Sequence, residues 1–138
     1  MVNEDIEVLT KTIYGEADGE TLLGKKAVAS VIMNRYKRRT WFSGKTIAET
    51  CKFCVKGSKY HQFSCWNPFD KAYKRIMRAS DEDLKECRDI AEKYINGTYK
   101  DVVCGCCHYH HVGINPKWAR GIKPDFYIGH HLFYSKVK

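Results

Sequence analysis

The sequence predicts an α+β fold, mainly helical in its N-terminal part and with a small antiparallel sheet at its C-terminal end. Up to Gly97, apolar residues recur at helical spacing between capping and turn residues. Beyond Gly97, short segments rich in β-branched, aromatic and histidine residues replace them. A run of helices followed by strands is typical of α+β domains. The 138 residues suffice for one hydrophobic core, so we expect a single domain over residues 1–138.

The first two predicted helices cover residues 4–17 and 20–38. In the first helix, Ile6, Leu9 and Ile13 fall on one apolar stripe. The second helix also has one apolar face, with lysines and polar residues pointing away from it. Each helix therefore has a face that must pack against the rest of the domain.

Two shorter helical segments should follow. The first covers residues 46–53, and an irregular stretch leads from it to residue 67. Pro68 suits an early position of the second, because the first turn of a helix does not use the amide hydrogen that proline lacks. Apolar residues at helical spacing continue this segment to residue 79.

The last predicted helix has the clearest boundaries. Ser80 can cap it, and Asp83 at the third helical position completes a capping box. Asn96 and Gly97 end it, since glycine readily takes the left-handed conformation of a helix C-terminus. The expected strands after this helix cover residues 102–103, 108–112 and 126–134.

Glu16 is the leading candidate for chemistry. It lies nearly in register with Leu9 and one turn beyond Ile13, so its carboxyl group lies on the apolar stripe of the first helix. A carboxyl group turned toward the interior is poorly solvated when charged, which raises its pKa and lets it hold a proton near neutral pH. Gly15 beside it lets a backbone or a substrate come close. The pattern predicts a general acid, and the alternative is a buried glutamate that serves only the fold.

Charge and composition narrow the partner class. The net charge of +8 favours polyanions such as nucleic acid, anionic membranes or an anionic cell wall. We expect the basic cluster at residues 35–39 to be a solvated helix end that complements the helix dipole. No run approaches the roughly 18 apolar residues of a membrane span. The acidic N-terminus lacks the features of a secretory signal, so we expect a chain without a signal peptide that is made in the cytoplasm.

The seven cysteines cannot all pair internally, because their number is odd. Free thiols in a reducing cytosol are the simplest interpretation. The Cys51–Cys54 and Cys104–Cys107 pairs could instead form a zinc site, with His108 or His110 as a spare ligand, or a disulfide. The separation of about fifty residues between the pairs is wider than in compact zinc modules. We expect no metal and no cofactor.

Four separated motifs resemble, in the same order, the spore-cortex-lytic cell-wall hydrolase family. They are YGEADGE at 14–20 with the helix ending VASVIMNR at 35, QFS at 62–64, HYH at 108–110 with PKWA at 116–119, and IGHHLFY at 128–134. The resemblance extends from about residue 8 to residue 135. It implies a lysozyme-like catalytic domain that cleaves the bond between N-acetylmuramic acid and N-acetylglucosamine in peptidoglycan. Several members act as lytic transglycosylases with a single glutamate, and the position that matches it here is Glu16.

The carboxyl groups near Glu16 are compatible with cleavage of a glycosidic bond. Cleavage needs a protonated carboxyl group at the leaving oxygen, and a hydrolase ordinarily adds a second carboxylate. A transglycosylase can dispense with it, because the 6-hydroxyl group of the substrate attacks instead. Asp18 and Glu20 are the only nearby candidates for a second carboxylate, and we expect Glu20 to be structural.

The candidate substrate contacts combine hydrogen-bonding groups with aromatic rings that can stack on a sugar. Neighbours in a strand point to opposite faces, so only one of Tyr109 and His110 should face the cleft. By the same rule only one residue of the pair His130–His131 can reach a site, and we expect His131 to support the fold or orient a site residue. For each candidate, a role in the core is the alternative. The candidates are Gln62, Ser64, Tyr109, His110, Trp118 and Tyr134.

The sequence therefore predicts a monomeric enzyme that binds peptidoglycan glycan strands and cleaves them with Glu16 as acid and then base. It would act on the cell wall after release or export. One alternative is a zinc-stapled basic nucleic-acid-binding module, although no nucleic-acid signature appears. Another is a peptidoglycan-binding relative without turnover. The leading prediction includes neither nucleic acid nor a membrane span.

Overall fold

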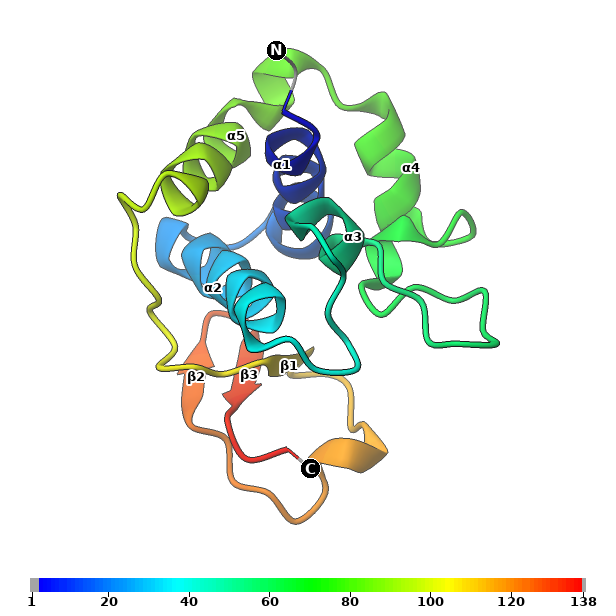
Figure 1. Ribbon diagram of the computed structural model, residues 1–138, viewed down its shortest axis with the longest axis vertical. Helices are drawn as coiled ribbons and strands as arrows, with labels where there is room; N and C mark the ends of the chain where they lie inside the picture. Colours follow the sequence, from blue (N-terminus) through cyan, green and yellow to red (C-terminus); the bar gives the residue numbers. More distant parts are fainter. Residues whose placement is uncertain (1–2, 138) are drawn as a thin grey trace.

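The computed structural model describes residues 3–137, with helices around a central helix and a small sheet beside them (Figure 1). The α-helices are α1 (Glu4–Ala17), α2 (Leu22–Arg38), α3 (Ile47–Cys51), α4 (Lys71–Arg78) and α5 (Asp81–Ile95). The 3₁₀-helices are η1 (Ser64–Trp66) and η2 (Lys117–Ala119), and the strands are β1 (His108–His111), β2 (Phe126–Ile128) and β3 (His131–Tyr134). The predicted α+β arrangement is confirmed. None of the helices in the described residues is long and apolar enough to cross a membrane.

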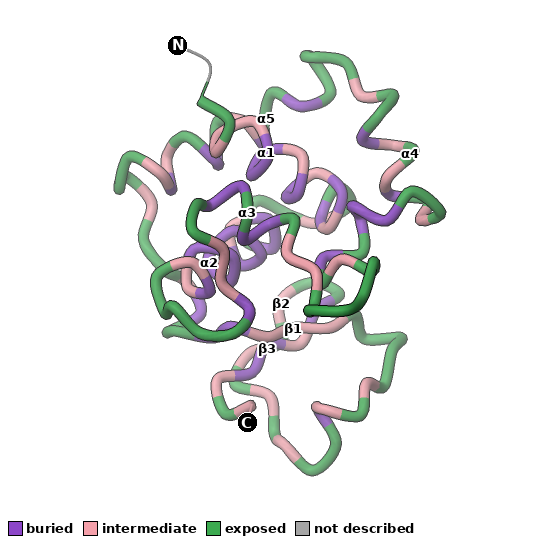
Figure 2. The backbone as a smooth tube through the Cα atoms, turned by 45° about the vertical axis from the view of Figure 1, so that its right-hand side comes forward, coloured by how far each residue is buried: buried purple, intermediate pink, exposed green. Residues whose placement is uncertain are grey.

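Helix α1 is the centre of the larger hydrophobic core. It packs against α2, α3, α4 and α5. Leu9 and Ile13 on its predicted stripe are fully buried, and burial is concentrated in α1 and α2 (Figure 2). Asn3 caps the helix, since its side chain accepts hydrogen bonds from the backbone amides of Asp5 and Ile6. The helix that carries Glu16 is thus fixed on several sides.

Gly15 allows α1 to approach its neighbours closely. A Cβ atom at this position would lie 2.6 Å from the Cβ of Cys65 in η1 and 2.6 Å from the Cδ1 of Ile76 in α4. Both distances are shorter than carbon atoms tolerate without displacement. The glycine therefore brings the last turn of α1 into contact with η1, which places the neighbouring Glu16 there too.

Helix boundaries follow the predicted capping residues except at α4. The reciprocal hydrogen bonds of the Ser80–Asp83 capping box are both present, and Gly97 has a φ of 85°. The prediction that Pro68 occupies an early helical position is wrong. Residues 67–70 form a turn, and α4 begins only after Asp70, whose carboxylate accepts the amide hydrogen of Ala72 at 2.8 Å.

The sheet has the strand order β1-β3-β2, and both strand pairs are antiparallel. The single strand expected over residues 126–134 is a hairpin, because Gly129 takes a φ of 59° and turns the chain. The strand expected at 102–103 is absent from the described residues. There the Asp101 carboxylate accepts the amide hydrogens of Val103 and Gly105, at 2.7 and 2.6 Å, and holds the chain in a turn.

A second, smaller core attaches the sheet to α2. It is formed by Ala27, Val31, Val103, Cys106 and Phe133. Phe133 in the central strand is fully buried. The sheet is therefore held against the helical part, which fixes β1 opposite the end of α1.

Replacement of Gly15 by alanine should lower the free energy of unfolding by about 1–3 kcal/mol, the usual cost of overpacking a core. Urea denaturation would measure the change. Gly19→Ala is the matched control, because a Cβ atom there would have no neighbour within 4 Å. The control should shift stability by no more than about 0.5 kcal/mol. Equal effects of the two substitutions would contradict the close approach at Gly15.

Candidate active site

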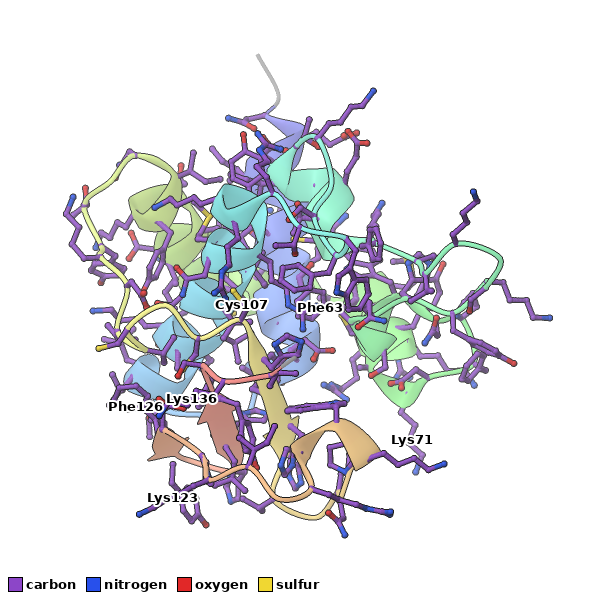
Figure 3. All side chains as sticks on the ribbon, turned by 60° about the horizontal axis from the view of Figure 1, so that its bottom comes forward. Phe63, Lys71, Cys107, Lys123, Phe126 and Lys136 are labelled. Atoms are coloured by element: carbon purple, nitrogen blue, oxygen red, sulfur yellow. The ribbon has the colours of Figure 1, made fainter. Side chains whose placement is uncertain are left out.

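A cleft of about 440 Å³ separates the helical part from the sheet. One wall comes from the end of α1, from η1 and from the start of α4, and the other from β1 and the loop that follows it. Phe63 and Lys71 belong to the helical wall; in Figure 3 Phe63 lies near α1, and Lys71 extends toward solvent. Six of the predicted site residues line this cleft: Glu16, Gln62, Ser64, Tyr109, His110 and Trp118.

The carboxyl group of Glu16 accepts a hydrogen bond on each oxygen. The hydroxyl of Tyr109 donates to Oε1, and the backbone amide of Cys65 donates to Oε2 at 3.3 Å. Burial raises the pKa of Glu16 above its ordinary value, and these two hydrogen bonds oppose part of the rise. Glu16 is still partly exposed toward the cleft. The site thus holds a carboxylic acid that keeps its proton to higher pH and can pass it to a bound molecule.

Tyr109 is held in position by the rings around it. Its ring lies 5.6 Å from that of Phe133 and 6.4 Å from that of Phe63, and the edge of His131 meets it at 5.0 Å. Burial and the neighbouring Glu16 raise the pKa of the Tyr109 hydroxyl well above its ordinary value. The hydroxyl group therefore remains protonated and available as a donor to Glu16.

Both Tyr109 and His110 line the cleft, whereas the alternation rule predicted only one of them there. Strand β1 is an edge strand, so the cleft reaches side chains on both of its faces. Tyr109 points to Glu16, while His110 contacts Trp118 with ring centroids 5.6 Å apart.

The structure does not place Tyr134 where it could stack on a sugar. Only 4% of this residue is exposed, and it lies outside the cleft wall. Its hydroxyl is 2.8 Å from the Nε2 atom of His110, and its ring meets Trp118 at 5.2 Å. Tyr134 therefore supports two residues that line the cleft instead of contacting substrate itself.

Glu20 stabilises the β2–β3 hairpin, in agreement with the structural role expected for it. Its Oε1 accepts the amide hydrogen of His130 at 2.9 Å, and its Oε2 lies 2.8 Å from the His130 ring. Burial alone would raise the pKa of Glu20, but these hydrogen bonds lower it. A Cβ atom on Gly129 would lie 1.9 Å from Oε1, so the turn requires glycine there. Glu20 does not line the cleft.

Sequence reasoning missed four charged residues that line the cleft: Arg35, Asp70, Lys71 and Arg75. Arg35 was expected to be a solvated cation, yet only 7% of it is exposed. Arg75 donates to the backbone oxygen of Gly15 at 3.2 Å, next to Glu16. The negative charge of Asp70 adds to the rise in the pKa of Glu16. The helix-capping position of Asp70 was readable from sequence, but the contacts that bring these residues to the cleft are between distant segments.

The cysteines form neither disulfides nor a metal centre in residues 3–137. All seven thiols are free, and no three metal-ligating side chains of this part of the chain come together. Burial raises the pKa of Cys51 and Cys106 to about 12 and that of Cys87 to about 11. Of these three, only Cys51 belongs to the predicted zinc site, and its raised pKa disfavours the thiolate form that zinc binds.

The cleft combines a carboxyl group whose pKa is raised by burial with groups that suit sugars, and this is the arrangement that an enzyme cleaving glycosidic bonds requires. Residues 19–134 match the sequence profile of the cell wall hydrolase family. The chain belongs to this family, whose substrate is peptidoglycan. The matched region begins three residues after Glu16, so the assignment of Glu16 depends on the geometry described above.

Two solved structures share the fold over nearly the whole chain. The catalytic domain of the SleB protein from Bacillus cereus has 22% identity and a TM-score of 0.64, and the match covers 96% of this chain and 90% of that one. The catalytic domain of the germination-specific lytic transglycosylase SleB from Bacillus anthracis has 21% identity and a TM-score of 0.66, with 98% and 97% covered. No curated protein sequence matches the chain.

The raised pKa of Glu16 has a consequence for stability. Above the ordinary carboxyl pKa the unfolded chain releases this proton while the native protein retains it, so this contribution to the free energy of unfolding falls until pH passes the native pKa. Glu16→Gln removes the titration. We therefore expect the stability of the variant relative to wild type to increase from about pH 4 upward and to level off once pH passes the native pKa of Glu16, measured by thermal or urea unfolding. A difference that is constant or moves the other way would contradict the raised pKa.

Proposed function

We propose that this protein is a lytic transglycosylase that cleaves the bond between N-acetylmuramic acid and N-acetylglucosamine, with Glu16 as the single catalytic acid and base. The observation that carries the proposal is the Glu16 carboxyl group, whose pKa is raised by burial and which is accessible from the cleft. Membership of the cell wall hydrolase family and the activity named for the similar Bacillus anthracis domain also support it.

In the first step, Glu16 donates its proton to the glycosidic oxygen as the bond from C1 of the muramoyl residue breaks. The bond electrons leave with that oxygen, so positive charge develops on the sugar ring and Glu16 becomes a carboxylate. The hydrogen bonds from Tyr109 and from the amide of Cys65 favour this anion. The same two donors thus limit the cost of losing the proton.

In the second step, the 6-hydroxyl group of the same muramoyl residue attacks C1 and closes a 1,6-anhydro ring. The hydroxyl proton passes to the Glu16 carboxylate, which restores the acid for another cycle. This step requires neither a water molecule nor a second carboxylate. Asp18 is exposed, and Glu20 is bound to the hairpin, so neither borders the cleft.

The other cleft residues suit a glycan. The amide of Gln62 and the hydroxyl of Ser64 can bond sugar hydroxyl and acetamido groups, and the ring of Trp118 offers an apolar face. The excess of positive charge suits an anionic cell-wall polymer.

Glu16→Gln should abolish the clearance of purified peptidoglycan sacculi, a loss of at least about 10²-fold, because an amide has no proton to transfer. Turbidity would follow the reaction. Asp18→Asn is the matched control, since it makes the same chemical change at an exposed position two residues away, and it should retain wild-type activity. A Glu16→Gln variant that clears sacculi as fast as wild type would refute the assignment.

The chemistry of the released fragments separates transglycosylation from hydrolysis. Mass spectrometry of the wild-type products should show anhydromuramic ends, and reducing ends would indicate hydrolysis. Asp70 is the only other carboxylate among residues 3–137 that borders the cleft, so a hydrolase would need it. Under the proposed mechanism, Asp70→Asn still yields anhydro products. A wild-type protein that binds sacculi but releases nothing would instead indicate a binding protein.

A further inference from the structure

A second cavity of about 290 Å³ adjoins the cleft. The two cavities share four wall residues: Arg35, Gln62, Tyr109 and Trp118. Beyond these, the second cavity is bordered by Trp41, His108 and Val137. The two spaces therefore form parts of one groove, which is longer than the part beside Glu16.

Arg35 is a largely buried cation at the junction of these cavities, and it forms no ion pair with any carboxylate of residues 3–137. Its Nε atom donates to the backbone oxygen of Cys107 at 2.6 Å, and its guanidinium carbon lies 5.0 Å from the ring centres of both Phe42 and Phe63. Its two Nη atoms make no hydrogen bond or ion pair with any residue in 3–137. Arg35 lines both cavities, so these free donors are available to an oxygen atom of a bound ligand.

Aromatic rings border the second cavity. Trp41 is 62% exposed, although large apolar side chains usually avoid water, and edge contacts with Phe42 and Phe53 hold its ring. His108 packs against Trp118 with ring centres 5.3 Å apart. Burial, with Arg35 and Arg38 nearby, lowers the pKa of His108 to about 4, so this imidazole is neutral at neutral pH. The cavity thus combines aromatic surfaces with a guanidinium group whose Nη donors are free.

We propose that the second cavity binds a further sugar of the glycan strand, against Trp41 and Trp118, and that Arg35 binds the lactyl arm of a muramoyl residue at the junction. This inference rests on the proposed function and names the group that the site recognises. The hydroxyl and acetamido groups of the glycan occur on both sugars, whereas the lactyl arm occurs only on muramic acid. That arm ends in a planar carboxylate, or in an amide where a peptide is attached. A planar guanidinium group with free Nη donors suits these oxygens.

The test measures binding with the Glu16→Gln variant as parent, so that ligands are not consumed. The ligands are an N-acetylglucosamine tetramer, a peptide-free tetrasaccharide of alternating N-acetylglucosamine and N-acetylmuramic acid, and the same tetrasaccharide with its peptides. Calorimetry gives the dissociation constants. Adding Trp41→Ala to this parent should weaken the binding of all three ligands about 3- to 10-fold, because the sugar loses its stacking contact. The control Tyr127→Ala removes an equally exposed aromatic ring that borders neither cavity, and it should leave binding unchanged.

Adding Arg35→Lys should weaken the two muramic-acid ligands at least about 10-fold, the usual effect of losing a hydrogen bond to a charged group. Binding of the N-acetylglucosamine tetramer should not change. A loss confined to the peptide-free ligand identifies the carboxylate as the bound form, and equal losses identify the oxygen common to both forms. Unchanged muramic-acid binding, or an equal loss for the N-acetylglucosamine tetramer, would overturn the role of Arg35.

Trp41→Ala keeps the test decisive if Arg35→Lys fails to fold, because Trp41 is mostly exposed. If Trp41→Ala binds every ligand as tightly as the parent, the second cavity is not a sugar site. Failure of the proposed function is a separate result, because the Glu16→Gln parent would then still cleave peptidoglycan.

Discussion

The contact between the last turn of α1 and η1 determines where the carboxyl group of Glu16 lies. Gly15 makes the contact possible, since any side chain there would collide with Cys65 and Ile76. Glu16 then meets the amide of Cys65 on one oxygen and the hydroxyl of Tyr109 on the other. Burial raises the pKa of Glu16, so the group can act as an acid. The two hydrogen-bond donors stabilise its anion, so the same group can then act as a base.

The sheet matters to this site because it supplies Tyr109. Phe133 and the residues around it hold the sheet against α2, and the Glu20 carboxylate holds the β2–β3 turn at His130. Glu20 and Glu16 lie only four residues apart in sequence, yet their environments shift their pKa values in opposite directions. Hydrogen bonds from His130 favour the charge on Glu20, whereas burial disfavours it on Glu16. This difference separates a structural carboxylate from the proposed catalytic acid.

Local patterns predicted the helices and the position of Glu16, because stripes and capping boxes depend on residues a few positions apart. The apolar stripe through Leu9 and Ile13 and the capping box at Ser80 are examples. Predictions failed where one side chain or one glycine decided the backbone, as Asp101 and Gly129 do. Contacts between segments that are distant in the sequence could not be predicted from local patterns either. The burial of Arg35 depends on Phe42, Phe63 and Cys107, which no spacing rule connects to it.

The central claim is that the Glu16 carboxyl group holds its proton above the ordinary range for a glutamate. Carbon-13 NMR of side-chain carboxyl groups across a pH titration measures this directly, and the signal that is lost in Glu16→Gln identifies the residue. The account predicts a titration midpoint above the ordinary glutamate pKa of about 4.3. A midpoint at or below that value would contradict it.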